Sequence, residues 1–188
     1  GQFTPFLNAL FVATSATCVT GLIVVDTYTH WTFFGQGVIL SLIQIGGLGL
    51  VTLTLFFNLL IRRKLGLRTL QLAQESTSAS NFEDTPRLLR GIVGISLTVE
   101  AIGAVLLLPA FVPKYGMEGI FISVFTSVSA FCNAGFDLLG REGPYSSLIH
   151  YNGSYVLLVV SALIIIGGLG FMVLFDLLHY HKSKKLRL

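Results

Sequence analysis

The chain has 188 residues, of which 53% are hydrophobic and 11% are charged, with a formal net charge of +3. Soluble domains carry about 25% charged residues, so this sequence has too few charges to cover a globular surface. The composition excludes an ordinary soluble domain and indicates an integral membrane protein.

The first predicted element is a short apolar segment at 4–16. Pro5 stands at its start, where a proline costs a helix little because the first N–H groups have no partner in the helix. No positively charged leader with a small-residue cleavage site precedes the segment, so we expect no signal peptide. Crossing about 30 Å of hydrocarbon takes about 20 helical residues. We therefore predict a half-spanning helix that enters the membrane and turns back.

The next elements are two longer apolar stretches that flank a polar linker. Residues 35–61 and 91–112 are long enough to span a bilayer. The linker at 62–90 holds six of the twelve Lys and Arg residues, and the tail at 179–188 holds four. By the positive-inside rule, we predict that the linker and the C-terminal tail are cytoplasmic.

A second short apolar segment at 117–130 and a third spanning stretch at 154–178 follow. Residues 91–178 then form one unit of span, half-helix, loop and span. Residues 1–61 form the same unit without its opening span, so we expect the chain to be an excerpt that lacks that helix. The predicted fold class is an all-α integral membrane protein of repeated helix–pore-loop–helix units with re-entrant half-helices, similar to K⁺ channels.

The main evidence for repetition is a string that occurs twice. The pattern F-x-x-x-S-A-x-C-x-x-G fills residues 11–21 and, 114 positions later, residues 125–135. Each copy is followed by an apolar helix that carries I-G-G-L-G, at 45–49 and at 166–170. Glycine clusters of this kind let another helix approach closely. We expect them to pack behind the loops rather than to act as hinges.

The residues after each S-A-x-C motif carry the predicted chemistry. Irregular backbone inside a membrane is tolerated only where protein buries it or where it lines a watery cavity. Rings of backbone carbonyls can replace the hydration shell of an ion, and glycine allows the backbone angles that this requires. The C-terminal end of a half-helix also favours a cation. The loops therefore predict a cation pathway, and the alternative is a tight turn between interfacial helices.

Two segments resemble the loops of a known family. T-S-A-T-C-V-T-G-L at 14–22 and S-V-S-A-F-C-N-A-G-F-D at 127–137 resemble the first and second pore loops of the Trk/Ktr/HKT potassium transporters, in particular the Ktr-type bacterial membrane subunit. The resemblance implies four pore repeats around one pathway, of which this chain has two. We expect the other two to be missing from this sequence rather than supplied by a second chain.

Carried over residue by residue, the resemblance implies two strands of a selectivity filter. The coordinating carbonyls would be those of Val19, Thr20, Gly21, Asn133, Ala134 and Gly135. The residues that flank the filter would be Cys18, Leu22, Cys132, Phe136 and Asp137. Both filter glycines are intact, which resembles the potassium-selective pattern rather than that of sodium-favouring relatives with serine.

The resemblance also implies partners. It implies K⁺ as the transported ion at the filter, with dependence on Na⁺ left open, and no covalent cofactor. It further implies a homodimer in the lipid of the cell membrane and a cytosolic regulatory ring of RCK domains, which would bind the nucleotide. The alternatives are a non-conducting membrane scaffold and a Na⁺-conducting relative.

Catalytic motifs are absent from the sequence. We find no phosphate-binding loop, no zinc-ligand spacing and no set of nucleophile and base. We therefore do not expect the chain to be an enzyme, to bind nucleotide itself or to bind nucleic acid.

Four polar residues have roles that the sequence leaves open or assigns weakly. Glu100 lies within a predicted span, where an acid is costly and therefore a functional candidate, but we favour a role in packing or assembly. Asp137 either holds its loop or attracts ions. Cys18 and Cys132 occupy equivalent places in the two repeats, and we expect them to pack behind the loops rather than to form a disulfide.

Overall fold

The computed structural model describes residues 4–49, 85–143, 145–151 and 155–169. Within these ranges all regular structure is helical and no strand occurs, which confirms the predicted all-α class. The chain divides into two compact units, and one of them contains Gly1–Gly47 and Thr98–Gly168. Everything below concerns this first unit unless stated otherwise.

The described part of the first repeat contains three helices. Helix α1, Phe6–Thr17, matches the short segment predicted at 4–16, and the Pro5 carbonyl accepts the first bonds of the helix. Helix α2, Thr27–His30, is a single turn. Helix α3, Phe33–Leu48, covers the described part of the stretch predicted at 35–61. Residues 50–61 of that stretch lie outside the described residues.

Helix α6, Thr85–Tyr115, contains the predicted span at 91–112. Its segment Arg90–Tyr115, 26 residues long, is the one helical segment of the described residues that is long and apolar enough to cross a membrane. The helix begins inside the stretch predicted as a linker, whose other residues, 62–84, lie outside the described ones. Its residues from Thr98 onward belong to the first unit.

The remaining helices follow the predicted order. Helix α7, Glu118–Phe131, matches the half-helix predicted at 117–130. A 3₁₀ turn, η1, covers Leu148–Tyr151, and α8 covers Tyr155–Gly168. The rest of the stretch predicted at 154–178 and the basic tail at 179–188 lie outside the described residues.

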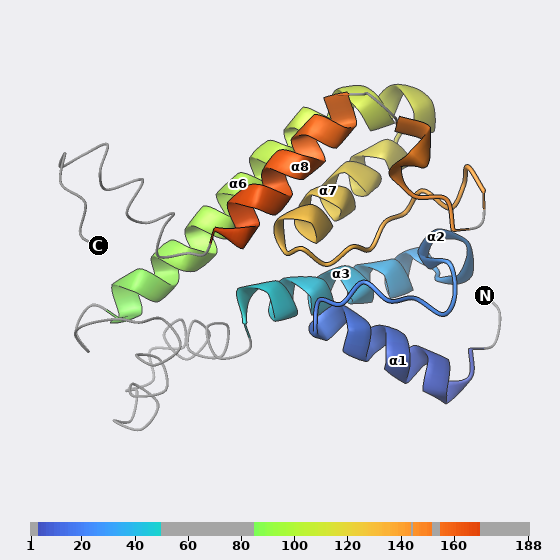
Figure 1. The fold of residues 1–188 in the computed structure, drawn as a ribbon, viewed down its shortest axis with the longest axis horizontal. Helices are drawn as coiled ribbons and strands as arrows, with labels where there is room; N and C mark the ends of the chain where they lie inside the picture. Colours follow the sequence, from blue (N-terminus) through green and yellow to red (C-terminus); the bar gives the residue numbers. More distant parts are fainter. Residues whose placement is uncertain (1–3, 50–84, 144, 152–154, 170–188) are drawn as a thin grey trace. The chain divides into compact units, whose positions relative to one another are not determined.

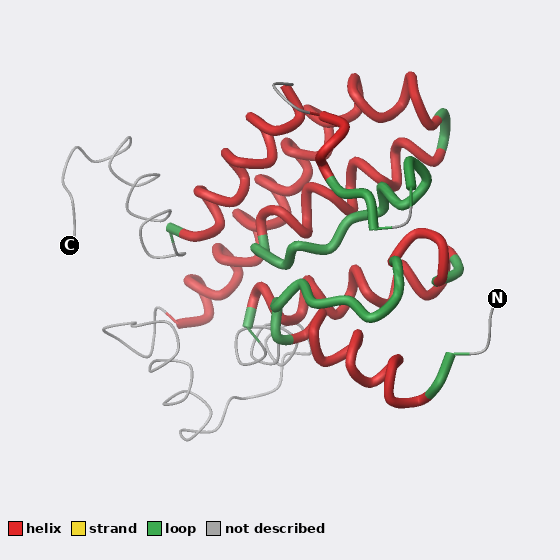
Figure 2. The backbone as a smooth tube through the Cα atoms, turned by 45° about the vertical axis from the view of Figure 1, so that its right-hand side comes forward, coloured by secondary structure: helices red, strands yellow, loops and turns green. Residues whose placement is uncertain are grey.

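The core of the unit joins both halves of the sequence. Figures 1 and 2 show α7 lying alongside α8, while the loops that follow α1 and α7 run next to each other. Fully buried side chains come from every long helix: Ala16, Ile43, Leu107, Phe111, Phe125 and Leu163 are all at most 4% exposed. They belong to one continuous cluster, so the two repeats share a single core.

Large apolar side chains are also exposed on these helices. Phe34 is 80% exposed on α3, Val105 is 63% exposed on α6 and Leu158 is 69% exposed on α8. A helix surface of this kind has no reason to face water, because burying such side chains is favourable. It fits contact with lipid or with other apolar protein.

Candidate functional site

The site is formed by the two loops that follow α1 and α7, called loop 1 (residues 18–26) and loop 2 (residues 132–143). At the end of α1 the Val19 N–H donates to the Ala16 carbonyl at 3.3 Å, and the Thr20 N–H donates to the Ser15 carbonyl at 3.0 Å. These two bonds form a Schellman motif, in which a left-handed residue ends the helix.

Helix α7 ends in the same way. The Asn133 N–H donates to the Ala130 carbonyl at 3.1 Å, and the Ala134 N–H donates to the Ser129 carbonyl at 2.8 Å. Every donor and acceptor lies 114 positions after its counterpart in α1. The repeated string therefore produces the same hydrogen-bonded helix end twice.

The backbone angles of the two loops also match. Val19 and Asn133 have φ of 56° and 58°, and Gly21 and Gly135 both have φ of 73°. Asparagine tolerates the left-handed region, but a β-branched residue there is strained. The strain at Val19 was not predicted, although its alignment with Asn133 in the repeated string could have revealed it. Strained backbone persists where the surrounding structure holds it in place, often at a functional site.

The loops meet at their glycines. A β-carbon on Gly21 would lie 2.6 Å from the Ala134 carbonyl oxygen and 3.3 Å from the Gly135 Cα. Figure 2 shows the two loops as adjacent green tubes. Gly21 is therefore required both by its positive φ and by the close approach of the other loop.

The six backbone carbonyls predicted to bind the ion lack donors within the described part of the chain. No described N–H or O–H group bonds to the carbonyl oxygens of Val19, Thr20, Gly21, Asn133, Ala134 or Gly135. Each set of carbonyls follows the C-terminal end of a helix, which carries partial negative charge. The arrangement concentrates acceptors and favours a cation.

Side-chain ligands for a metal ion are not gathered here. The described residues contain no group of three or more His, Cys, Asp or Glu side chains that could hold a metal. Cys18 and Cys132 are both free thiols.

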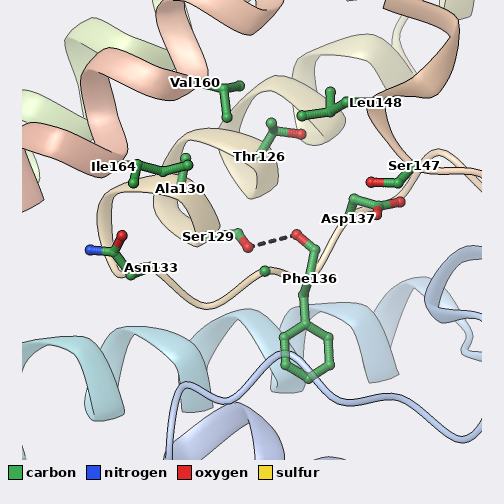
Figure 3. A pocket seen from close by; sticks show the side chains of 11 residues that line it. Thr126, Ser129, Ala130, Asn133, Phe136, Asp137, Ser147, Leu148, Val160 and Ile164 are labelled. Carbon is green, nitrogen blue, oxygen red and sulfur yellow. Dashed lines mark hydrogen bonds between the residues drawn. The ribbon is translucent and has the colours of Figure 1, made fainter. Parts of the chain in front are cut away.

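Loop 2 is braced by its own side chains. The Ser129 hydroxyl donates to the Phe136 carbonyl at 2.6 Å, and the Asp137 carboxylate accepts the Leu139 N–H at 3.0 Å. Asp137 thus holds the loop, one of the two roles that the sequence left open. Figure 3 shows Asp137 beside Ser147 at one end of a cavity of about 210 Å³, with Asn133 at the other end.

The glycine clusters pack against the helix ends, as the sequence predicted. Gly46 on α3 lies against the Thr17 carbonyl, the last of α1, and Gly167 on α8 lies against the Phe131 carbonyl, the last of α7. Any β-carbon at either glycine would overlap the carbonyl group. These two glycines therefore let α3 and α8 support the base of loops 1 and 2.

Asp26 joins the two loops, a role that sequence analysis missed. One carboxylate oxygen caps α2 by accepting the N–H groups of Tyr28 and Thr29 at 3.0 and 2.8 Å. The other accepts the Tyr145 N–H at 2.9 Å, 119 residues away. Gly140 lies directly against the carboxylate. The cap could have been suggested by the position of an acid directly before Thr27-Tyr28-Thr29, since aspartate is a preferred N-cap residue. Nothing in the sequence indicated that Tyr145 of the second repeat would be its other partner.

Two ion pairs lie near the loops on the exposed surface. Lys114 contacts Glu142 at 2.9 Å, and Arg141 contacts Glu118 at 3.2 Å. The hydrogen bond from Lys114 lowers the pKa of Glu142. Burial raises the pKa of Tyr28, whose hydroxyl donates to Glu118. Exposed pairs of this kind add little stability, so they hold side-chain positions rather than the fold.

The chain is similar to known transport proteins along its whole length. The family described as TrkH, cation transport protein, matches residues 1–188. The potassium/sodium uptake protein NtpJ of Enterococcus hirae is 42% identical over 189 residues, which cover 100% of this chain and 41% of that protein.

Two Ktr proteins show the same extent of similarity. The Ktr system potassium uptake protein B of Bacillus subtilis is 41% identical, covering 95% of this chain and 40% of that protein. Its namesake from Vibrio alginolyticus is 41% identical, covering 94% and 38%. The chain thus spans about two-fifths of the length of these curated relatives.

Proposed function

The chain belongs to the TrkH family of cation transport proteins, and from this premise we propose that loops 1 and 2 are two strands of a K⁺ selectivity filter. The observation that carries the proposal is the matched backbone of the two loops, which have positive φ at the same positions and, after two helix C-termini, carbonyls that accept no bond from any described residue. A cation transport protein works in a membrane, so the chain is a membrane protein.

The mechanism we propose is dehydration by backbone oxygen atoms. A K⁺ ion that enters between the loops exchanges its water for carbonyl oxygens, at little cost if these are already held in place. The Schellman bonds fix the base of each strand, and the glycines at 21 and 135 set the direction of the next carbonyls. The partial negative charge of the ends of α1 and α7 adds attraction for the ion.

Two filter strands cannot surround an ion by themselves. The contacts between the two repeats support the presence of further repeats, because in the described part of the chain the second repeat lacks contacts that the first one makes. Gly47 of the first repeat lies against Cys132 of the second, but among the described residues the equivalent Gly168 has only the Asn133 amide nitrogen near the position of a β-carbon, at 4.0 Å. Ile43 is fully buried, whereas its counterpart Ile164 is 42% exposed.

Contacts of this type are head-to-tail, because each repeat uses a different face toward its neighbour. A head-to-tail contact leaves one face open at each end and closes only when a ring is complete. Cys18, exposed in contrast to the partly buried Cys132, lies on the face left open at the other end. We therefore propose that loops from further repeats complete the filter, in line with the four-repeat arrangement that the resemblance implies.

The transported ion is proposed to be K⁺. The relatives are named for potassium uptake or for potassium and sodium uptake. Both loops have glycine at the third filter position, Gly21 and Gly135, where φ is 73°, which fits a K⁺ filter. Dependence on Na⁺, and a Na⁺-conducting relative, are alternatives that flux measurements separate. A non-conducting scaffold has no need for unpartnered carbonyls within the membrane.

The proposed assembly is a homodimer in the cell membrane with the linker and tail on the cytoplasmic side. The names of the relatives from Bacillus subtilis and Vibrio alginolyticus refer to a Ktr system, which supports a partner subunit. We propose a cytosolic ring of RCK domains as that partner and as the place where a nucleotide binds. The chain itself is proposed to catalyse no reaction.

Growth and flux test this function. The full-length protein, expressed with its partner in a bacterium that lacks potassium uptake, should restore growth at low K⁺ and take up Rb⁺ in preference to Na⁺. Gly135→Ser should weaken that preference, because serine at φ of 73° distorts the strand. Unchanged discrimination between the ions at normal membrane abundance would exclude loop 2 as part of the filter.

A further inference from the structure

Glu100 is a buried acid with a specific set of contacts. It lies on α6 with only 4% of its surface exposed. Its Oε1 atom accepts a hydrogen bond from the Gln44 side-chain amide on α3 at 2.9 Å. The Cys132 thiol lies 4.0 Å from the same oxygen, within reach of a weak S–H donor. The carboxyl group thus joins α6 to α3 and to the base of loop 2.

No basic side chain among the described residues pairs with Glu100. The two ion pairs there are formed by Lys114 and Arg141 with other acids. An acid within a membrane span is costly and is usually retained for a role. The Glu100 carboxyl instead contacts two neutral donors, Gln44 and Cys132. Its role therefore depends on which part of the structure these two residues position.

These contacts position the start of loop 2, the second proposed filter strand. Cys132 caps α7 and directly precedes Asn133, the left-handed residue that begins the strand. Gly47 packs against the Cys132 sulfur, so the thiol lies between α3 and the Glu100 carboxyl. Any sideways shift of Cys132 would therefore move the Asn133 peptide.

A second contact joins the backbone of Glu100 to α7, the helix that precedes loop 2. The Ser127 hydroxyl donates to the Glu100 backbone carbonyl at 2.7 Å, and Gly103, one turn later, lies against the same hydroxyl. Helix α6 is thus held at a fixed distance from α7 at this level. The Glu100 side chain therefore has a rigid base from which to hold Gln44 and Cys132.

We infer that Glu100 is a positioning residue for ion selectivity: through Gln44 and Cys132 it sets the position of loop 2 against the first repeat. The inference rests on the proposed function, because it assumes that loop 2 is a filter strand. It assigns to Glu100 an acceptor role, with no contact to the permeating ion.

The test is a double-mutant cycle in the full-length protein, with the ratio of Rb⁺ to Na⁺ uptake as the readout. Glu100→Leu should lower the ratio about tenfold, the size of effect expected when a partly buried donor loses its hydrogen-bond acceptor. Gln44→Leu should do the same. The double variant should lose no more than Glu100→Leu alone, because Gln44→Leu removes a contact that Glu100→Leu already removes.

Glu100→Gln provides the rescue, since its amide oxygen remains an acceptor. It should keep the ratio within about twofold of the natural protein. Ser96→Ala is the matched control, because Ser96 is also buried one turn earlier on α6 and its hydroxyl donates to the Ile92 carbonyl of the same helix. It should leave the ratio unchanged.

Membrane abundance is measured alongside, since a purely structural role would lower abundance and leave the ratio intact. An unchanged ratio in Glu100→Leu overturns the inference, and so do additive losses in the double variant. If Glu100→Leu does not reach the membrane, Gln44→Leu decides by the same criterion. An altered ratio in Gly135→Ser with no change in the Glu100 and Gln44 variants overturns this inference alone, whereas an unaltered ratio in Gly135→Ser counts against the filter itself.

Discussion

The glycines at the contact between the loops allow a sharp test of how the repeats are arranged. A β-carbon on Gly21 would lie 2.6 Å from the Ala134 carbonyl oxygen, and ordinary contact begins at 3.4 Å. The oxygen would have to move by the difference, about 0.8 Å. Displacements of about 1 Å can cost about a hundredfold at a site that requires exact geometry. We therefore expect Gly21→Ala to lower the Rb⁺/Na⁺ uptake ratio by about tenfold or more.

Gly135 has the same φ as Gly21 but a different surrounding. A β-carbon there would meet only the Gly21 Cα, at 3.5 Å, which is ordinary contact. If the head-to-tail contact continues to another loop, however, that loop's carbonyl would lie where the Ala134 carbonyl lies for Gly21. Gly135→Ala should then be as damaging as Gly21→Ala in the full-length protein.

Gly116→Ala separates backbone strain from steric displacement. Gly116 has φ of 63° and no atom within 4 Å of the position of a β-carbon. Alanine in the left-handed region costs about 1–2 kcal/mol at all three positions, so Gly116→Ala should reduce abundance slightly and leave the ion ratio intact. The assay is radioactive Rb⁺ and Na⁺ uptake normalised to membrane abundance. A Gly135→Ala variant that behaves like Gly116→Ala would refute the continued head-to-tail arrangement.

Two further predictions concern stability. Val19→Asn should raise the melting temperature of the detergent-solubilised protein by a few degrees, because asparagine tolerates φ of 56° and relieves about 1 kcal/mol of strain; a fall would show that the valine side chain packs more favourably than its backbone is strained. Asp26→Ala should lower it, since losing the cap costs about 1 kcal/mol and the Tyr145 N–H loses its acceptor. The melting temperature of Asp26→Asn, which keeps one acceptor, should lie between those of Asp26→Ala and the natural protein. Equal melting temperatures of Asp26→Ala and the natural protein would show that the Asp26 contacts do not stabilise the fold.

The local features of the fold could be predicted from the sequence. The apolar segments at 4–16 and 117–130 became α1 and α7, because their composition and length determine short apolar helices. The ends of both helices were predictable from the repeated S-A-x-C string, since a Schellman end depends on neighbouring residues. The packing of Gly46 and Gly167 behind the loops followed from the repeated glycine clusters.

The contacts between repeats could not be predicted. Asp26 meets Tyr145 across 119 positions, and Gln44 meets Glu100 across 56. No periodicity or spacing relates such residues, because their proximity arises only when helices from both repeats pack into one core. The same holds for the Gly21 contact with Ala134. The sequence thus indicated which residues carry the loops, and the structure shows how one loop is held against the other.

The central claim is that backbone oxygen atoms of loops 1 and 2 replace water around a permeating K⁺ ion. The most direct measurement is anomalous diffraction from crystals of the full-length protein grown with Rb⁺. The account predicts Rb⁺ density between the two loops, next to the carbonyls of residues 19–21 and 133–135. Rb⁺ density found elsewhere in the protein, with these carbonyls turned away from it, would contradict the account.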